Sequence, residues 1–110
     1  MPYAFVKLNI DGTEYTGTDH GVGPVDASLN AIQKITGKIS ELRIKDYGLA
    51  SISGGSTALC EVTISVEDAQ GNRVSAKSVG EDIVTTSVQA VIDGINRIML
   101  KKMLQEKQLN

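Results

Sequence analysis

The sequence predicts an α+β fold made of two similar units, in which strands forming antiparallel sheet are followed by a helix and both helices cover one face. Alternating apolar and polar residues indicate strands, and two longer stretches carry apolar residues at helical spacing. The second half also repeats the first after a shift of 59 residues, which places Gly21 on Gly80. At 110 residues the chain is expected to form a single domain over 1–110.

The first unit is expected over about residues 3–37 and opens with two strands. Residues 3–10 alternate between apolar and polar side chains, which is typical of a half-buried strand. Asp11-Gly12 is a hairpin turn signal, and residues 13–18 are rich in Thr and Tyr. We therefore expect the two strands to pair as a hairpin.

A glycine-rich turn at residues 21–27, Gly-Val-Gly-Pro-Val-Asp-Ala, precedes the first helix. Glycine permits close backbone approaches, and Pro24 suits the first helical turn. Apolar residues recur at helical spacing over 24–35, and Gly37 stands where a C-terminal cap belongs. The N–H groups of the first turn could seat a small anion, such as a carboxylate or phosphate. The plainer alternative is an economical strand-to-helix turn.

The second unit is expected over about residues 41–103 and contains three strands. The first, at 42–53, is interrupted before Gly48, where we expect a bulge or bend. The glycines at 54–55 end this strand, and residues 59–66 then alternate strictly between apolar and polar. This alternation predicts one buried face.

A turn at residues 68–72 leads to a third strand at 73–79 and then to the longest helix. The tail at 101–110 is polar and is expected to fray. The helix carries one apolar stripe, made by Val84, Val88, Val91, Ile92, Ile95, Ile98 and Met99.

The two units can pack about a pseudo-twofold axis, but they differ in one strand. In the second unit a strand at 42–53 comes first, and the matching strand of the first unit would lie before Met1. The first unit is therefore expected to have an uncovered sheet edge, which invites a partner chain.

The composition argues against several classes of function. The net charge is −2, and the chain has one Phe, three Tyr and no Trp, so nucleic acid is not an expected partner. No apolar run is long enough to span a membrane, and no signal peptide is recognisable. The single Cys60 suits a reducing cytoplasm, where we expect this protein to reside.

The sequence offers no catalytic group, metal site or cofactor site. His20 is the single histidine, so no histidine cluster can form, and no Cys/His spacing suggests zinc. His20 could touch a ligand beside the glycine turn, although a surface position is the plainer interpretation. Ser28 and Ser87 lie in predicted helices without a base in reach.

Several motifs together resemble the C-terminal regulatory domain of the 2-isopropylmalate synthase and citramalate synthase family. The resemblance covers nearly the whole chain. It implies two strand-strand-strand-helix units that form a homodimer and bind the end-product amino acid near the dimer interface, leucine in isopropylmalate enzymes and isoleucine in citramalate enzymes. It rests on Asp11-Gly12, Tyr15, Gly17, residues 21–27, Asp46-Tyr47, Ser53-Gly54-Gly55, Ala58, Asp82-Ile83, Ser87 and Ile95-Asn96-Arg97.

The resemblance also implies where the effector binds. The N–H groups at residues 23–26 would hold its carboxylate, and Asp26 or backbone oxygens would hold its ammonium group. As plainer alternatives, Ile44, Ala58 and Ile83 are ordinary core residues, and Asp26 complements the helix dipole. The expected effector-binding residues are Gly21, Val22, Gly23, Pro24, Val25, Asp26, Ile44, Tyr47, Ser51, Ala58 and Ile83.

The catalytic part of such enzymes is a metal-dependent barrel of roughly 250 residues, and none of it is present in these 110 residues. The chain alone is therefore not expected to condense acetyl-CoA with a 2-keto acid. We expect it to pass a leucine or isoleucine signal to a barrel in the same or another chain. The alternative is a structural dimerisation module without a ligand.

Overall fold

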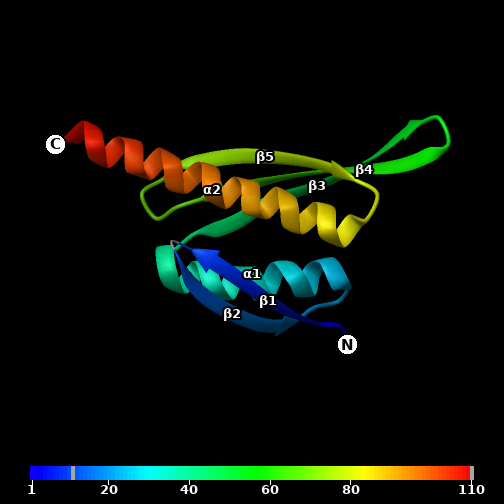
Figure 1. The fold of residues 1–110 in the computed structure, drawn as a ribbon, viewed down its shortest axis with the longest axis horizontal. Coiled ribbons are helices and arrows are strands. Elements are labelled where there is room, and N and C mark those ends of the chain that lie inside the picture. Colours follow the sequence, from blue (N-terminus) through cyan, green and yellow to red (C-terminus); the bar gives the residue numbers. More distant parts are fainter. Residues whose placement is uncertain (11, 110) are drawn as a thin grey trace.

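A computed structural model describes residues 1–10 and 12–109 and confirms the α+β class. All strand pairs are antiparallel, and each unit ends in one helix (Figure 1). The elements in chain order are β1 (Tyr3–Ile10), β2 (Thr13–His20), α1 (Pro24–Ser40), β3 (Arg43–Gly54), β4 (Thr57–Glu67), β5 (Arg73–Gly80) and α2 (Ile83–Leu109).

The predicted hairpin of the first unit is confirmed. Strands β1 and β2 pair from Tyr3 opposite His20 to Ile10 opposite Thr13. Strand β2 continues two residues beyond its predicted end at Thr18. Asp11 of the predicted turn lies outside the described residues.

The prediction that Gly37 caps the first helix was wrong. Helix α1 continues to Ser40 and ends where Glu41 takes the left-handed conformation, with φ of 53°. The Gln33 side chain then holds the next segment, because its Nε2 donates to the Leu42 carbonyl (2.6 Å) and its Oε1 accepts from the Ile44 N–H (2.9 Å). The left-handed Glu41 thus ends the helix, and Gln33 ties the chain that follows back to α1.

The predicted irregularity in the first strand of the second unit is confirmed. The pairing of β3 with β4 slips between Lys45 and Gly48, and Asp46 has φ of 55°. A Cβ at Gly48 would lie 2.7 Å from the Thr63 hydroxyl, so this position needs glycine for space. The predicted break after β3 is also present, as a turn with Gly55 at φ of 77°.

Helix α2 is longer than expected, and the prediction of a frayed tail was wrong. The helix runs to Leu109 because the polar tail is rich in strong helix formers. The side chains of Gln105 and Asn72 also exchange two hydrogen bonds, of 3.1 and 3.2 Å. Within the described residues, no helix combines the length and the apolar character that crossing a membrane requires.

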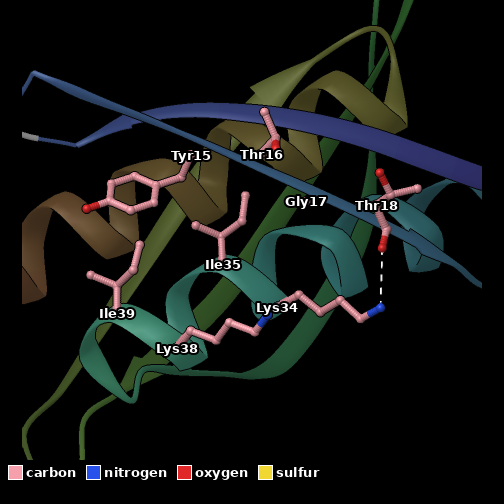
Figure 2. A pocket seen from close by; sticks show the side chains of 8 residues that line it. All are labelled: Tyr15, Thr16, Gly17, Thr18, Lys34, Ile35, Lys38 and Ile39. Carbon is pink, nitrogen blue, oxygen red and sulfur yellow. Dashed lines mark hydrogen bonds between the residues drawn. The ribbon is translucent and has the colours of Figure 1, made fainter.

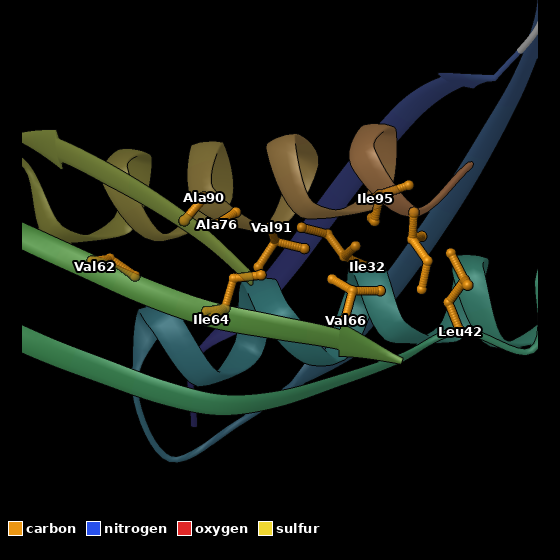
Figure 3. Close-up of a cluster of buried hydrophobic side chains, with 10 residues drawn as sticks. Ile32, Leu42, Val62, Ile64, Val66, Ala76, Ala90, Val91 and Ile95 are labelled. Atoms are coloured by element: carbon orange, nitrogen blue, oxygen red, sulfur yellow. The ribbon is translucent and has the colours of Figure 1, made fainter. Parts of the chain in front are cut away.

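The strands form two sheets, ordered β1-β2 and β3-β4-β5, and the two units share one core. Helix α1 packs on β1 and β2, α2 packs on β4 and β5, and the helices contact each other. Figure 3 shows the centre of this core, where Ile32 of α1 meets the inner face of β4 and α2. The buried cluster contains Ile32, Leu42, Val62, Ile64, Val66, Ala76, Ala90, Val91, Ile95 and Ile98.

Replacement of Gly17 by alanine should destabilise the fold, since its Cβ would lie 2.7 Å from the Ala31 carbonyl oxygen and 2.8 Å from Ile35 Cγ1. We expect Gly17→Ala to lower the free energy of unfolding by about 1–3 kcal/mol, as overpacking does. Gly37→Ala is the control, because only Gln33 Nε2 lies near its Cβ position, at 3.4 Å, and alanine is favoured inside a helix. Urea denaturation measures both, and equal losses would contradict the packing argument.

Candidate functional site

The turn before α1 is tightly closed by its own hydrogen bonds. The buried Gly21 donates its N–H to the Pro2 carbonyl (3.1 Å), and a Cβ there would lie 2.5 Å from the Ala27 nitrogen. Asp26 Oδ2 accepts from the Val22 N–H (3.1 Å). The turn thus carries a carboxylate of its own beside its N–H groups.

The equivalent turn before α2 is closed differently. Asp82, which the 59-residue shift places on Gly23, caps the helix: its Oδ2 accepts from the backbone N–H (2.8 Å) and hydroxyl (2.6 Å) of Thr85. Its carbonyl accepts from the Thr86 N–H (2.9 Å). Ile83 follows this cap with its side chain partly exposed. Both helices begin at the same end of the molecule (Figure 1).

The bulge of β3 is anchored to α2 and β5 by two side chains. The Tyr47 hydroxyl lies 2.7 Å from Ser87 Oγ, and Ser87 is fully buried in α2. The neighbouring Asp46 carboxylate pairs with Arg73 on β5. The sequence gives no local sign of this contact, because the two residues lie 40 positions apart.

Ser87 does not share the hydrogen-bond partner of its repeat counterpart. Its counterpart under the 59-residue shift is Ser28, whose hydroxyl donates to the Pro24 carbonyl of its own helix (2.8 Å). Ser87 faces Tyr47 instead. A serine at the same place in both helices therefore closes the first turn in one unit and holds a neighbouring strand in the other.

The remaining predicted residues are spread along the β3-β4 hairpin. Ile44 is half-buried and packs against the core. Ser51 and Ala58 are exposed near the tip, where Ser51 lies opposite Cys60. Ile44 and Ser51 are about 20 Å apart along one strand. One protomer thus brings Tyr47 close to the start of α2 but does not bring Ile44 and Ser51 together.

The outer part of this hairpin, residues 49–59, projects beyond the start of α2 and is called the arm below (Figure 1). Leu49 is 51% exposed and Ile52 is 36% exposed. Val79 at the end of β5 is 50% exposed and lies opposite Glu61, just below the arm. The arm and its base therefore expose apolar side chains on both faces of the sheet.

The described residues offer no cluster of three or more His, Cys, Asp or Glu side chains that could hold a metal ion. His20 is exposed at the end of β2, with Nδ1 3.4 Å from the Asp19 carboxylate and its ring 5.7 Å from that of Tyr3. Cys60 Sγ donates to the Gly80 carbonyl at 3.3 Å.

Comparison with known proteins assigns the family. Residues 1–99 match the family model described as the LeuA allosteric (dimerisation) domain. The chain belongs to this family. The resemblance seen in the sequence is thereby confirmed.

The relatives are enzymes much longer than this chain. It is 43% identical to the 2-isopropylmalate synthase of Methanocaldococcus jannaschii, over 93% of this chain and 19% of that protein. It is 40% identical to a probable 2-isopropylmalate synthase of Methanosarcina mazei, over 92% of this chain and 20% of that protein. It is 35% identical to a putative (R)-citramalate synthase of Methanoculleus marisnigri, over 90% of this chain and 20% of that protein. The chain thus spans about a fifth of the length of the curated relatives it matches.

The Asp82 cap should make stability depend on pH. Hydrogen bonds from the Thr85 side chain and backbone hold the pKa of Asp82 below its ordinary value. A carboxyl with a lowered folded pKa stabilises the fold above its unfolded pKa of about 4, and this stabilisation is lost as pH falls through the folded pKa. Asp82→Ala should therefore lower Tm at neutral pH, by an amount that shrinks in acid.

Thermal unfolding followed by circular dichroism between about pH 7 and about pH 2.5 measures this difference. Glu81→Ala, at the exposed neighbouring position, is the control. A Tm difference for Asp82→Ala that stays constant over the whole pH range would contradict the assigned role of the carboxylate.

Proposed function

We propose that this chain is the effector-binding, dimer-forming domain of a 2-isopropylmalate synthase-like enzyme. In this proposal it binds a branched-chain amino acid, leucine in preference to isoleucine, for feedback inhibition of leucine and isoleucine biosynthesis. The family match over residues 1–99 carries the proposal. The anchored Tyr47 and the partly exposed Ile83 near the start of α2 support it.

The proposed pocket uses the two helix starts and the β3-β4 hairpin. An amino acid needs N–H donors for its carboxylate, an acid or carbonyls for its ammonium group, and an apolar wall for its side chain. Asp26 supplies the acid, and the first turn of α1 supplies N–H groups. Tyr47 and Ile83 form the wall in this proposal, together with Val25, Ser51 and Ala58.

A second copy of the chain completes the pocket in this proposal. The family description names dimerisation, and the exposed Leu49, Ile52 and Val79 need cover that one protomer does not give them. Exposed apolar side chains on both faces of a projecting arm suit a partner chain that encloses the arm. The arm of one protomer would therefore pack against its partner and bring Ser51 and Ala58 to the effector.

Feedback inhibition would work through a shift in the population of dimer arrangements. The effector stabilises one arrangement more than another, and the coupling equals that difference in binding free energy. The receiver would be a catalytic barrel in the same chain or another chain, consistent with relatives about five times longer than this chain. The domain itself needs no cofactor for this role.

A structural dimerisation module without a ligand is the alternative function. The hydrogen bond from the Val22 N–H to Asp26 favours it, because the turn satisfies part of its donor capacity internally. A bound amino acid would have to use the remaining N–H groups of the first helical turn.

Isothermal titration of the chain with leucine and isoleucine, together with its mass in solution, tests the effector. We expect saturable leucine binding to a dimer and weaker isoleucine binding. Asp26→Asn should raise the Kd for leucine about tenfold, as expected for loss of a charge-assisted hydrogen bond. Asp93→Asn is the matched control, because it also replaces a carboxylate by an amide, but on α2, where Asp93 accepts a hydrogen bond from Gln89. A dimer without heat from either amino acid would favour the structural module.

The arm can be tested separately from the ligand. Leu49→Asp with Ile52→Asp should convert the dimer to a monomer, because both side chains are exposed in one protomer and would be buried against its partner. Leu104→Asp is the control, since Leu104 is equally exposed but lies at the far end of α2. Sedimentation velocity measures the mass, and an unchanged dimer in the arm variant would contradict the proposed interface.

A further inference from the structure

A groove of about 330 Å³ lies between the outer edge of β2 and helix α1, away from the proposed effector residues. Figure 2 shows the Tyr15 ring above Ile35 and Ile39, with Lys34 and Lys38 along the helix. Its volume falls within the range of small-molecule sites. The lining residues are Tyr15, Thr16, Gly17, Thr18, Lys34, Ile35, Lys38 and Ile39.

The backbone of β2 presents hydrogen-bonding groups to this groove. Two carbonyls point away from β1 toward α1: that of His20 accepts from Asn30 Nδ2 (3.0 Å), and that of Thr18 accepts from Lys34 Nζ (3.3 Å). In an antiparallel pair every second residue directs its N–H and C=O to the same edge. The N–H and C=O of Thr16 therefore also point to the groove.

The spacing of the existing contacts between β2 and α1 indicates that Lys38 comes next in line, level with Thr16. Strand β2 and helix α1 run in opposite directions, and Asn30 and Lys34 already match His20 and Thr18. Four residues of a helix advance about 6 Å and two residues of a strand advance about 6.6 Å. The same spacing therefore pairs Lys38 of α1 with Thr16 of β2. In residues 1–10 and 12–109, Lys38 makes no hydrogen bond or ion pair.

The second unit provides an internal comparison. The 59-residue shift places Thr16 on Ser75 and Lys38 on Arg97, and Arg97 Nη1 donates to the Ser75 carbonyl at 2.8 Å. The same shift places Ile39, which is 37% exposed, on the fully buried Ile98. In the second unit Arg97 and Ile98 are taken up by contacts within the protein. In the first unit the equivalent Lys38 and Ile39 remain accessible to a ligand.

The charges of the groove favour one negative group. Lys34 Nζ lies 3.7 Å from Asp19 Oδ2, so the positive charge of this lysine already has a carboxylate partner. The hydrogen bond from the His20 N–H, aided by the Lys34 charge, holds the pKa of Asp19 below its ordinary value, and Asp19 is ionised at neutral pH. Lys38 therefore supplies the single net positive charge of the groove.

We propose that this groove binds a small aliphatic monocarboxylate. The carboxylate accepts hydrogen bonds from the Lys38 ammonium group and the Thr16 N–H, while the aliphatic part packs on Tyr15, Ile35 and Ile39. An amino acid is disfavoured, because its ammonium group would lie beside Lys38. The site is therefore distinct from the proposed effector pocket and does not depend on it.

Titration of the ¹⁵N-labelled chain with 3-methylbutanoate, followed by NMR, tests the proposal. We expect saturable shifts of the Thr16, Thr18 and Ile39 amides. The neutral 3-methylbutanamide should cause no saturable shift there. Lys38→Met should raise the Kd about tenfold, the loss expected for one charge-assisted hydrogen bond. Lys7→Met, on the outer face of β1, should leave the Kd unchanged.

Three outcomes would overturn the proposal: equal shifts from the acid and its amide, no saturable shift at β2, or a Kd unaffected by Lys38→Met. Shifts confined to residues 21–26 and Ile83 would also overturn it, because the carboxylate would then prefer the helix starts. A parallel titration with leucine, followed at Tyr47 and Ile83, reports on the effector pocket alone. Failure of one site is thus distinguishable from failure of the other.

Discussion

The packing of β4 against α2 is the contact on which the rest of the structure depends. The inner side chains Val62, Ile64 and Val66 are fully or almost fully buried, and a Cβ at Gly94 would lie 2.8 Å from both Ile64 and Val66. This close approach sets the distance between helix and sheet. It therefore also sets where the first turns of α2 lie relative to the bulge of β3, and whether Ser87 can reach Tyr47.

The two units have the same order of elements but use equivalent positions differently. Gly23 begins α1 without a side-chain cap, whereas Asp82 caps α2. Where the helices approach the outer edge strands, Arg97 is bound to the strand and Lys38 is not. Because the repeated elements are needed to build the shared core, differences of this kind are where the two halves can acquire separate roles.

Part of the candidate site could be predicted from the sequence, and part could not. The family resemblance selected Tyr47 and Ile83, and the need of a tyrosine hydroxyl for a partner is general chemistry. The identity of that partner, Ser87, depends on how β3 and α2 pack, which no local pattern contains. The exposure of Leu49 and Ile52 could not be predicted either. Alternation of apolar and polar residues shows which face of a strand a side chain is on, but not whether another element packs on that face.

The sequence by itself determined the order of strands and helices, the repeat and the family, because side-chain periodicity and turn residues act over a few positions. The tertiary structure decided where the helices end. Helix α1 passes Gly37 and stops where Gln33 binds the backbone of Leu42 and Ile44, and α2 extends to Leu109 with Gln105 bound to Asn72. It also decided that the strands divide into two sheets around one core. The two sheets and their shared core depend on contacts between residues distant in the chain, whereas the length of α2 also reflects the strong helix formers of its tail.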